Sequence, residues 1–202
     1  MLTKSQERNR KAIECAAAEL FLTGGYEATT MDMVAEVAHV SKATLYSHCK
    51  NKATLFEQVI LTIGGEVPGD VADMPLENGA APVLTSLASR LLSSMITPHS
   101  LAVVRTVAGL APRLPQFGEA LYVHAIAVKR SLAAGVLRRM SADGLIDLED
   151  AEQAADTFLS LLTADFYLRK LLGLPEQEQL EQAVQRAVGQ FLQTCRHPHT
   201  LR

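Results

Sequence analysis

Tryptophan is absent from the 202-residue sequence, and cysteine is scarce, with three residues in all. Cys15, Cys49 and Cys195 lie far apart, and none stands in a Cys-x-x-Cys or Cys/His spacing of the kind that metal sites use. An odd number of isolated cysteines excludes a scaffold held by disulfides and is typical of reduced thiols in a cytosolic protein. We therefore expect no metal site and no cofactor.

Long apolar runs and an excess of positive charge are also missing. We find no apolar run long enough to cross a bilayer and no N-terminal segment with the order of a secretory signal. We therefore expect a cytoplasmic protein with no membrane partner. The formal net charge of -3 excludes a broadly basic nucleic-acid coat, so any contact with DNA has to be local.

Sequence motifs of catalysis are lacking as well. The chain has no Gly-x-Ser-x-Gly elbow, no phosphate-cradling glycine loop and no carboxylate pair near a histidine at motif spacing. We therefore expect that the protein is not an enzyme, although a catalytic site assembled in space from distant residues stays open.

What the sequence does contain is a helical period. Apolar residues repeat at three- and four-residue spacing, which predicts helices and no convincing strand. Gly24-Gly25 and Gly64-Gly65 are expected to end helices, Asn51 to cap one and Pro98 to open one. The sequence thus predicts an all-α fold of about nine helices. The expected ranges are 5–23, 31–38, 42–49, 52–65, 83–95, 98–111, 117–140, 149–172 and 175–195, with a loop over 66–82.

Residues 31–49 fit a helix-turn-helix. This motif needs a small residue where its helices approach each other, an apolar residue in the turn and an apolar anchor in the recognition helix. Ala35, Val40 and Leu45 meet these needs in order. No acidic residue occurs between Val37 and Ala53, which concentrates positive charge where a recognition helix would face DNA. The polar groups of this surface are Lys42, Thr44, Tyr46, Ser47, His48, Lys50 and Lys52.

The same stretch resembles the TetR family. The family signature is a helix ending in Phe and then Gly-Tyr, Thr-rich capping, a small helix, and Val-Ser-Lys-x-Thr-Leu-Tyr-x-His-Phe-x-x-Lys. In this chain the matching residues, in the same order and spacing over about residues 10–60, are Phe21, Gly25-Tyr26, Thr29-Thr30, Val34-Ala35 and Val40-Ser41-Lys42-Ala43-Thr44-Leu45-Tyr46-Ser47-His48-Cys49-Lys50-Asn51-Lys52.

The resemblance implies an N-terminal three-helix DNA-binding domain over 1–50 and a larger helical domain for ligand binding and dimerisation over 51–202. It places Tyr46, His48 and Lys52 mostly on phosphates and Ala43 and Thr44 nearest to bases. A merely exposed polar face is the alternative interpretation of these residues. The expected DNA-binding set is Thr30, Ser41, Lys42, Ala43, Thr44, Tyr46, His48 and Lys52.

Two positions depart from the family pattern. His39 stands where the turn has glycine, and a non-glycine residue in a left-handed conformation costs about 1 kcal/mol. Cys49 stands where the family has Phe, so a smaller side chain packs the end of the recognition helix. We expect Cys49 and Cys15 to be inert small hydrophobic residues rather than oxidant sensors.

The C-terminal half resembles AcrR/AefR-type regulatory domains over residues 105–117. The resemblance implies a repressor that binds a palindromic operator as a homodimer and is released by a small molecule, expected here to be hydrophobic or aromatic. An activator or a protein-interaction module is the alternative. The last two helices are expected to form the dimer, through apolar seams of Leu159, Leu162 and Phe166 with Leu180, Val184, Ala187, Val188 and Phe191.

Six residues are candidates for the ligand site. Arg105 lies within an apolar run, where it either anchors an anionic ligand or pairs with an internal acid such as Asp165. The aromatic candidates fit the core equally well. The full set is Arg105, Phe117, Tyr122, His124, Phe158 and Asp165.

Overall fold

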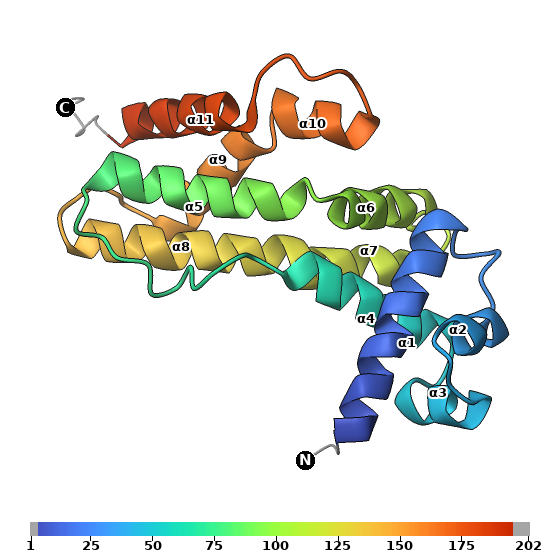
Figure 1. Ribbon diagram of the computed structural model, residues 1–202. Helices are drawn as coiled ribbons and strands as arrows, with labels where there is room; N and C mark the ends of the chain where they lie inside the picture. The colour runs from blue at the N-terminus through green and yellow to red at the C-terminus, as the bar shows by residue number, and fades with distance from the viewer. Residues whose placement is uncertain (1–3, 196–202) are drawn as a thin grey trace. The chain divides into compact units, whose positions relative to one another are not determined.

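The computed structural model describes residues 4–195, and within them it is helical with no strand (Figure 1). This confirms the predicted all-α class. The helices are α1 (Lys4–Thr23), α2 (Met31–Val37), α3 (Lys42–His48), α4 (Lys52–Gly65), α5 (Ala80–Met95), α6 (Pro98–Leu110), α7 (Pro115–Leu121), the π-helical turn η1 (Tyr122–Ile126), α8 (Ala127–Ala142), α9 (Ala151–Leu162), α10 (Asp165–Leu172) and α11 (Leu180–Thr194).

Most predicted helix ends lie within a few residues of the observed ones, and the exceptions are near the C-terminus. The helix predicted over 149–172 is two helices, because the backbone of Ala164 leaves the helical region at ψ -141. The sequence predicts that the last helix starts at Pro175, whereas it begins at Leu180, where Gln179 and Gln182 form a capping box. Within residues 4–195 this gives one helix more than predicted when α7, η1 and α8 are taken as one run.

The chain packs into two compact units. Among the described residues, unit 1 comprises 4–65 and 102–125, and unit 2 comprises 66–101 and 126–195. Packing therefore groups residues 102–125 with the N-terminal helices. The predicted boundary between residues 50 and 51 separates two functional domains and stays a prediction. The ends of those predicted domains, residues 1–3 and 196–202, lie outside the described residues.

Unit 1 is centred on four aromatic rings. Phe56 of α4 and Phe117 of α7 meet edge to face at 4.9 Å between ring centroids, and Tyr26 lies 5.0 Å from Phe117. Phe21 of α1 completes the cluster at 5.1 Å from Phe56. Because such pairs add to the free energy of apolar burial, this cluster ties α7 to the N-terminal helices.

Lys52 fixes the loop between α1 and α2. Its ammonium donates to the backbone carbonyls of Tyr26 at 3.0 Å, Glu27 at 3.3 Å and Thr29 at 3.1 Å, and it lies 4.5 Å from the centroid of the Tyr26 ring. An ammonium has three donors, so these carbonyls can satisfy all of them. Lys52 is half-buried and joins the start of α4 to the loop.

Helix α4 runs beside the helix that contains α7 and η1. Phe56 contacts Phe117, and further along Gly64 contacts Ala125, so the two helices run in the same direction. A Cβ atom built on Gly64 would lie 2.8 Å from the Cβ of Ala125, closer than side chains approach. The lack of a side chain at Gly64 therefore permits this close packing.

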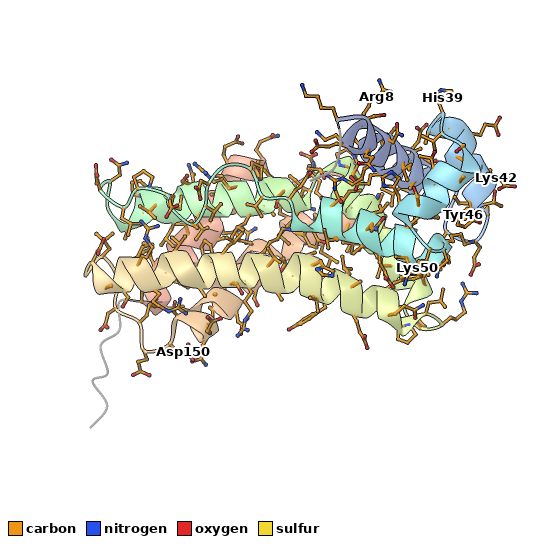
Figure 2. All side chains as sticks on the ribbon, turned by 90° about the horizontal axis from the view of Figure 1, so that it is seen from below. Arg8, His39, Lys42, Tyr46, Lys50 and Asp150 are labelled. Atoms are coloured by element: carbon orange, nitrogen blue, oxygen red, sulfur yellow. The ribbon has the colours of Figure 1, made fainter. Side chains whose placement is uncertain are left out.

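Unit 2 has α8 and α11 packed on α5, with α9 packed on both α8 and α11. Phe158 and Phe191 meet edge to face at 5.0 Å in its core. The Arg139 guanidinium donates to the carbonyls of Ala72 and Met74 and so holds the loop before α5. Asp150, labelled in Figure 2, caps α9 by accepting from the backbone N–H of Glu152 at 2.8 Å.

The apolar seams expected to form a dimer are largely internal. Six of the eight residues named for them are buried within the core of unit 2 in this single chain: Leu162, Phe166, Val184, Ala187, Val188 and Phe191. The expectation that these residues face a partner is wrong, because unit 2 uses this apolar stripe to pack α9, α10 and α11 onto its other helices. A helical stripe shows that a face is buried and not what buries it.

The helical run Pro115–Ala142 corrects another expectation. With 28 residues, it is long and apolar enough to cross a membrane by length and composition alone. Phe117 of this run lies in the core of unit 1, and Ala133 and Leu137 lie in the core of unit 2. Core helices of water-soluble proteins pass the same test, so the run is weak support for a membrane span.

Replacing Lys52 should destabilise the protein. Lys52→Met leaves three backbone carbonyls without their charged donor, and we expect it to lower the free energy of unfolding by about 1–3 kcal/mol in urea titrations at fixed protein concentration. Lys50→Met, a change of the same side chain at an exposed neighbouring position, is the control and should have little effect. Equal losses for the two variants would contradict an anchoring role for Lys52.

Gly64→Ala should also destabilise, although alanine favours helices. The added methyl group meets Ala125, and overpacking of this kind costs about 1–3 kcal/mol, more than the roughly 1 kcal/mol gained from helix propensity. Gly109→Ala in α6 is the matched control, because a Cβ there meets no atom within 4 Å. Thermal unfolding should show a lower Tm for the first variant and an equal or higher Tm for the second. A rise in Tm for both variants would show that α4 and η1 can move apart enough to admit the added methyl group, and it would contradict the prediction.

Candidate DNA-binding site

Helices α2 and α3 form a helix-turn-helix closed by a Schellman motif. The backbone N–H of Val40 donates to the carbonyl of Ala35 at 3.0 Å, and that of His39 donates to the carbonyl of Glu36 at 3.1 Å. These two hydrogen bonds satisfy carbonyls at the end of α2 and fix the direction in which α3 leaves.

His39 occupies the left-handed position of this turn. Its φ is +53°, as expected for a residue that stands where glycine is usual. Among residues 4–195 it is the one residue other than glycine with a positive φ. The imidazole is exposed (Figure 2), so the strain lies in the backbone and the side chain is free to face a partner.

The recognition helix α3 is capped at its start and anchored by one leucine. Ser41 Oγ accepts from the backbone N–H of Thr44 at 3.1 Å. Leu45 is fully buried in the core of unit 1, and Ala35 belongs to the same core at 4% exposure. This burial agrees with the sequence-based roles of the two residues as helix anchor and as small residue at the crossing.

The predicted DNA-binding residues fall into two groups. Thr30 and Ser41 act as N-caps, because Thr30 Oγ1 accepts from the backbone N–H of Met33 at 3.2 Å. The residues of α3 are exposed or half-buried along its outer side, and Tyr46 is 52% exposed. Figure 2 labels Lys42 and Tyr46 on α3 and Lys50 in the turn that follows it. The complete set on α3 is Lys42, Ala43, Thr44, Tyr46 and His48.

Lys52 differs from the other predicted residues. Its ammonium is bound to the carbonyls of the loop between α1 and α2 rather than directed outward. A structural role for Lys52 thus has direct support from the geometry. A phosphate contact by Lys52, which the family resemblance implies, stays a prediction.

Lys42 has an acidic partner that the sequence did not reveal. Its ammonium lies 2.8 Å from the carboxylate of Asp32 in the first turn of α2. The hydrogen bond to Asp32, followed by its charge, raises the pKa of Lys42 above its ordinary value. From the sequence Asp32 fits only as a favourable charge at a helix start, because the approach of α2 and α3 is set by the turn between them.

Helix α1 offers a further candidate outside the predicted set. Its N-terminal end lies at the same end of unit 1 as α3 (Figure 1), and the two helices are in contact. Arg8, near that end, is exposed (Figure 2). An exposed arginine on the first turns of a helix is common, so the sequence offers no signal that separates Arg8 from other surface charges.

Cys49 is buried at the end of α3. Its exposed fraction is 4%, its Sγ lies 3.5 Å from the carbonyl of Leu45, and burial raises the pKa of the thiol. A thiol with a raised pKa is a poor nucleophile at neutral pH, which supports the sequence-based interpretation of a small core residue.

The six candidate ligand residues are divided between the two units: Arg105, Phe117, Tyr122 and His124 belong to unit 1, and Phe158 and Asp165 belong to unit 2. Phe117 and Phe158 are fully buried in the cores of unit 1 and unit 2, respectively. Tyr122 is 57% exposed and His124 is half-buried, both in unit 1. Core packing therefore accounts for the two phenylalanines, which was the alternative that the sequence left open.

Asp165 is not the internal acid that the sequence suggested as a partner for Arg105, because it is exposed. Both residues are exposed, and the Asp165 carboxylate accepts from Arg169, one turn later in α10, at 2.9 Å. Arg105 points outward because its position in the helical period of α6 falls between the buried Val103 and Val107. The apolar neighbours of Arg105 in the sequence therefore gave no indication that Arg105 itself is exposed.

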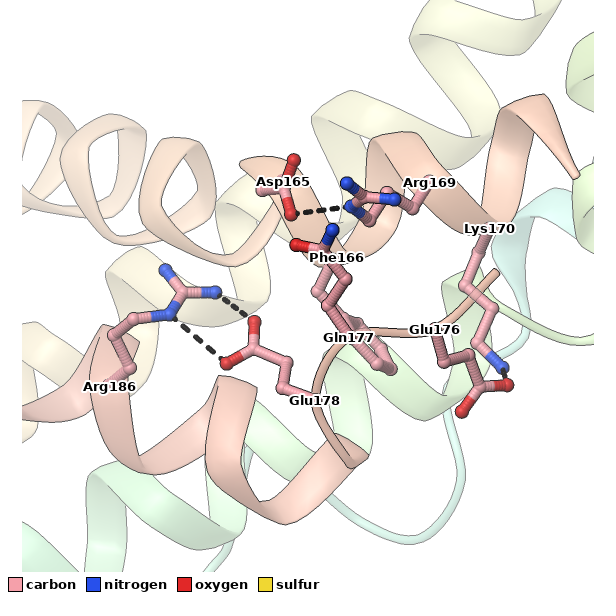
Figure 3. A pocket seen from close by; sticks show the side chains of 8 residues that line it. All are labelled: Asp165, Phe166, Arg169, Lys170, Glu176, Gln177, Glu178 and Arg186. Carbon is pink, nitrogen blue, oxygen red and sulfur yellow. Dashed lines mark hydrogen bonds and ion pairs between the residues drawn. The ribbon is translucent and has the colours of Figure 1, made fainter. Parts of the chain in front are cut away.

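Asp165 does line a hollow in unit 2. The hollow has a volume of about 410 Å³, and three acid–base pairs line it (Figure 3). Arg186 donates to Glu178 at 2.6 Å, and Lys170 contacts both Glu176 and, at 5.6 Å, the ring of Phe166. The charges that line the hollow are thus paired with one another. Among residues 4–195 no cluster of His, Cys, Asp and Glu is suited to a metal ion.

Comparison with known proteins identifies the family of both halves of the chain. Residues 15–59 match the tetR family of bacterial regulatory proteins, and residues 82–195 match the AefR-like transcriptional repressor C-terminal domain. The HTH-type transcriptional regulator YvkB of Bacillus subtilis is 28% identical over 183 residues, which cover 85% of this chain and 90% of YvkB. YhgD, another HTH-type regulator of Bacillus subtilis, is 46% identical over 54 residues, which span 28% of its length.

Solved structures agree over nearly the full length. A TetR-family transcriptional regulator from Mesorhizobium loti superposes with a TM-score of 0.82 at 26% identity, covering 96% of this chain and 98% of that one. The flavonoid-responsive regulator FrrA superposes with a TM-score of 0.75 at 29% identity, covering 94% and 97% of the two chains. With its helix-turn-helix over α2 and α3 and a regulatory domain that matches over 82–195, the chain belongs to the TetR family of transcriptional regulators.

Proposed function

We propose that the protein is a cytoplasmic repressor that binds a palindromic operator as a homodimer through α3 and is released by a small hydrophobic or aromatic molecule. The single observation that supports it best is the outer side of α3, which exposes Lys42 and Tyr46 from a helix fixed by a cap and a buried anchor. A rigid helix with polar and cationic side chains is what reading of the major groove requires.

The charge distribution supports DNA as the partner. The chain has a net charge of -3, yet residues 38–52 contain no acid and three lysines. A local concentration of positive charge on an acidic protein limits phosphate binding to one surface. Ser41 and Thr30 stabilise the helices from which this surface is built.

A homodimer is supported by the geometry of operators. Two recognition helices must reach successive major grooves about 34 Å apart, which one copy of α3 cannot do. In unit 2, α10 and the turn after it expose Leu168, Leu172 and Leu174 at 49%, 63% and 48%. A cluster of exposed leucines is uncommon on a monomer, and it offers the last helices an apolar contact different from the seams that fill the core.

Repression and ligand release are supported by relatives. The C-terminal match is to a domain described as a transcriptional repressor, and FrrA is described as flavonoid-responsive. Release follows when a ligand favours a separation of the two recognition helices that no longer fits successive grooves. Among the ring-bearing candidate ligand residues, Tyr122 and His124 are the two that core packing does not account for.

The DNA-binding prediction concerns Tyr46. In fluorescence anisotropy with the DNA beside its own gene, we expect wild type to bind tightly with an affinity that falls steeply with salt. Tyr46→Ala should weaken binding about tenfold or more, because it removes a phosphate contact at each half-site. Tyr122→Ala, which removes an equally exposed tyrosine elsewhere in unit 1, should leave affinity unchanged in the absence of ligand.

The same assay separates the alternatives. No specific binding by wild type would overturn the operator-binding proposal and favour a protein-interaction module. Specific binding that no aromatic or hydrophobic molecule reverses would overturn ligand release and leave DNA binding in place.

The dimer prediction concerns Leu172. Leu172→Glu places a charge on the exposed apolar surface of α10, and we expect it to shift sedimentation from dimer toward monomer at micromolar concentration. Leu61→Glu introduces the same change at a leucine of unit 1 that is 49% exposed, and it should remain dimeric. A fully dimeric Leu172→Glu variant would place the interface away from α10.

A further inference from the structure

We propose that Asp32 is a positioning residue that holds Lys42 away from DNA phosphates and thereby limits the affinity of the recognition helix for DNA of any sequence. This inference rests on the proposed function, because it describes how the DNA-binding surface is regulated by its own charges. Asp32 lies on α2 and Lys42 on α3, so the pair joins the two helices of the motif.

The geometry places the carboxylate on the cation directly. Lys42 Nζ lies 2.8 Å from Asp32 Oδ2, and the two side chains are 66% and 65% exposed. An exposed ion pair adds little to folding, so stability does not explain it well. The pair has a larger effect on the net charge of the surface of α3. While Asp32 binds Lys42, the two charges cancel, and Lys42 attracts a phosphate less strongly.

The small number of lysines on this surface makes the effect large. Residues 38–52 contain Lys42, Lys50 and Lys52. Lys52 donates to three carbonyls of the loop between α1 and α2. Lys42 and Lys50 are the lysines of this stretch that are exposed, and Asp32 compensates one of these two charges.

Compensation acts most strongly on binding without sequence preference. Nonspecific DNA binding depends almost entirely on phosphate contacts, whereas operator binding also gains from contacts to bases. A carboxylate that competes with phosphate for Lys42 therefore weakens nonspecific binding by a larger share. Asp32 in this way raises the ratio of operator affinity to nonspecific affinity.

The test is a salt titration of DNA binding by charge variants, with an operator duplex and a random duplex. Asp32→Asn should bind the random duplex about three- to tenfold more tightly at 0.1 M salt. The slope of log affinity against log salt should steepen by about one per protomer, because each freed lysine neutralises one more phosphate. Glu36→Gln is the control, since it removes the same charge from the same helix without touching Lys42. Asp32→Glu, which keeps the charge, should stay near wild type.

A double variant assigns the effect to the pair. In the Lys42→Met background, Asp32→Asn should leave the salt slope unchanged, because the freed cation is absent. Equal slopes for wild type and Asp32→Asn, when wild type binds DNA, would overturn the inference and leave the proposed function intact. Equal steepening by Glu36→Gln would also overturn it, by showing a general effect of net charge.

A second measurement needs no DNA. It therefore distinguishes failure of the Asp32 inference from failure of the proposed DNA-binding function. Acylation of lysines by an amine-reactive reagent, read by mass spectrometry, should modify Lys42 several-fold faster in Asp32→Asn than in wild type or Glu36→Gln. The reason is that the ion pair keeps the amine protonated and shielded. Equal rates would show that the pair does not form in solution and would overturn the inference. Absence of DNA binding by wild type, with the rates as expected, would overturn the proposed function, and with it the effect of Asp32 on DNA.

Discussion

The hydrogen bonds of Lys52 are the constraint on which unit 1 depends. Its ammonium gathers three carbonyls from the loop that connects α1 to α2, and it rests against the Tyr26 ring of the aromatic cluster. A charged donor shared by three backbone acceptors fixes a loop more firmly than neutral bonds would. The start of α2, and with it the turn that positions α3, is thereby tied to α4.

The second constraint is that the apolar side of each helix has to be buried against another element. Val184, Val188 and Phe191 on α11 meet α5 and α9 within unit 2, which uses up the apolar side of the last helix. What α11 leaves exposed is mainly polar, whereas α10 and the turn after it expose Leu168, Leu172 and Leu174. The helical period of α11 therefore determines both which of its residues enter the core of unit 2 and which remain exposed.

The sequence was informative wherever one residue type has one structural use. Ser41 and Asn51 as caps, Leu45 as anchor and His39 in a left-handed turn follow from local chemistry, and each has the expected geometry. Prediction was poorer where the outcome depends on residues distant in sequence. Neither Thr163 nor Ala164 is a helix breaker, so the local sequence did not predict the break between α9 and α10.

The candidate site shows the same limit. The identity of the polar residues on α3 could be predicted, but the partners of its charges could not. Lys42 meets Asp32 across a turn, and Lys52 meets carbonyls of a loop far earlier in the chain. Arg105 and Asp165 were expected to be internal, and the helical phase of α6 and the position of Asp165 at the start of α10 left them exposed.

The discontinuity of unit 1 has a consequence for how the protein is made. Phe117, which touches both Tyr26 and Phe56, is translated long after them, and the intervening residues 66–101 belong to unit 2. A nascent chain that ends at residue 65 therefore exposes the aromatic faces that Phe117 later covers. Closing this large loop delays completion of the DNA-binding half until α7 has left the ribosome, and an N-terminal fragment cut after α4 would lack part of its own core.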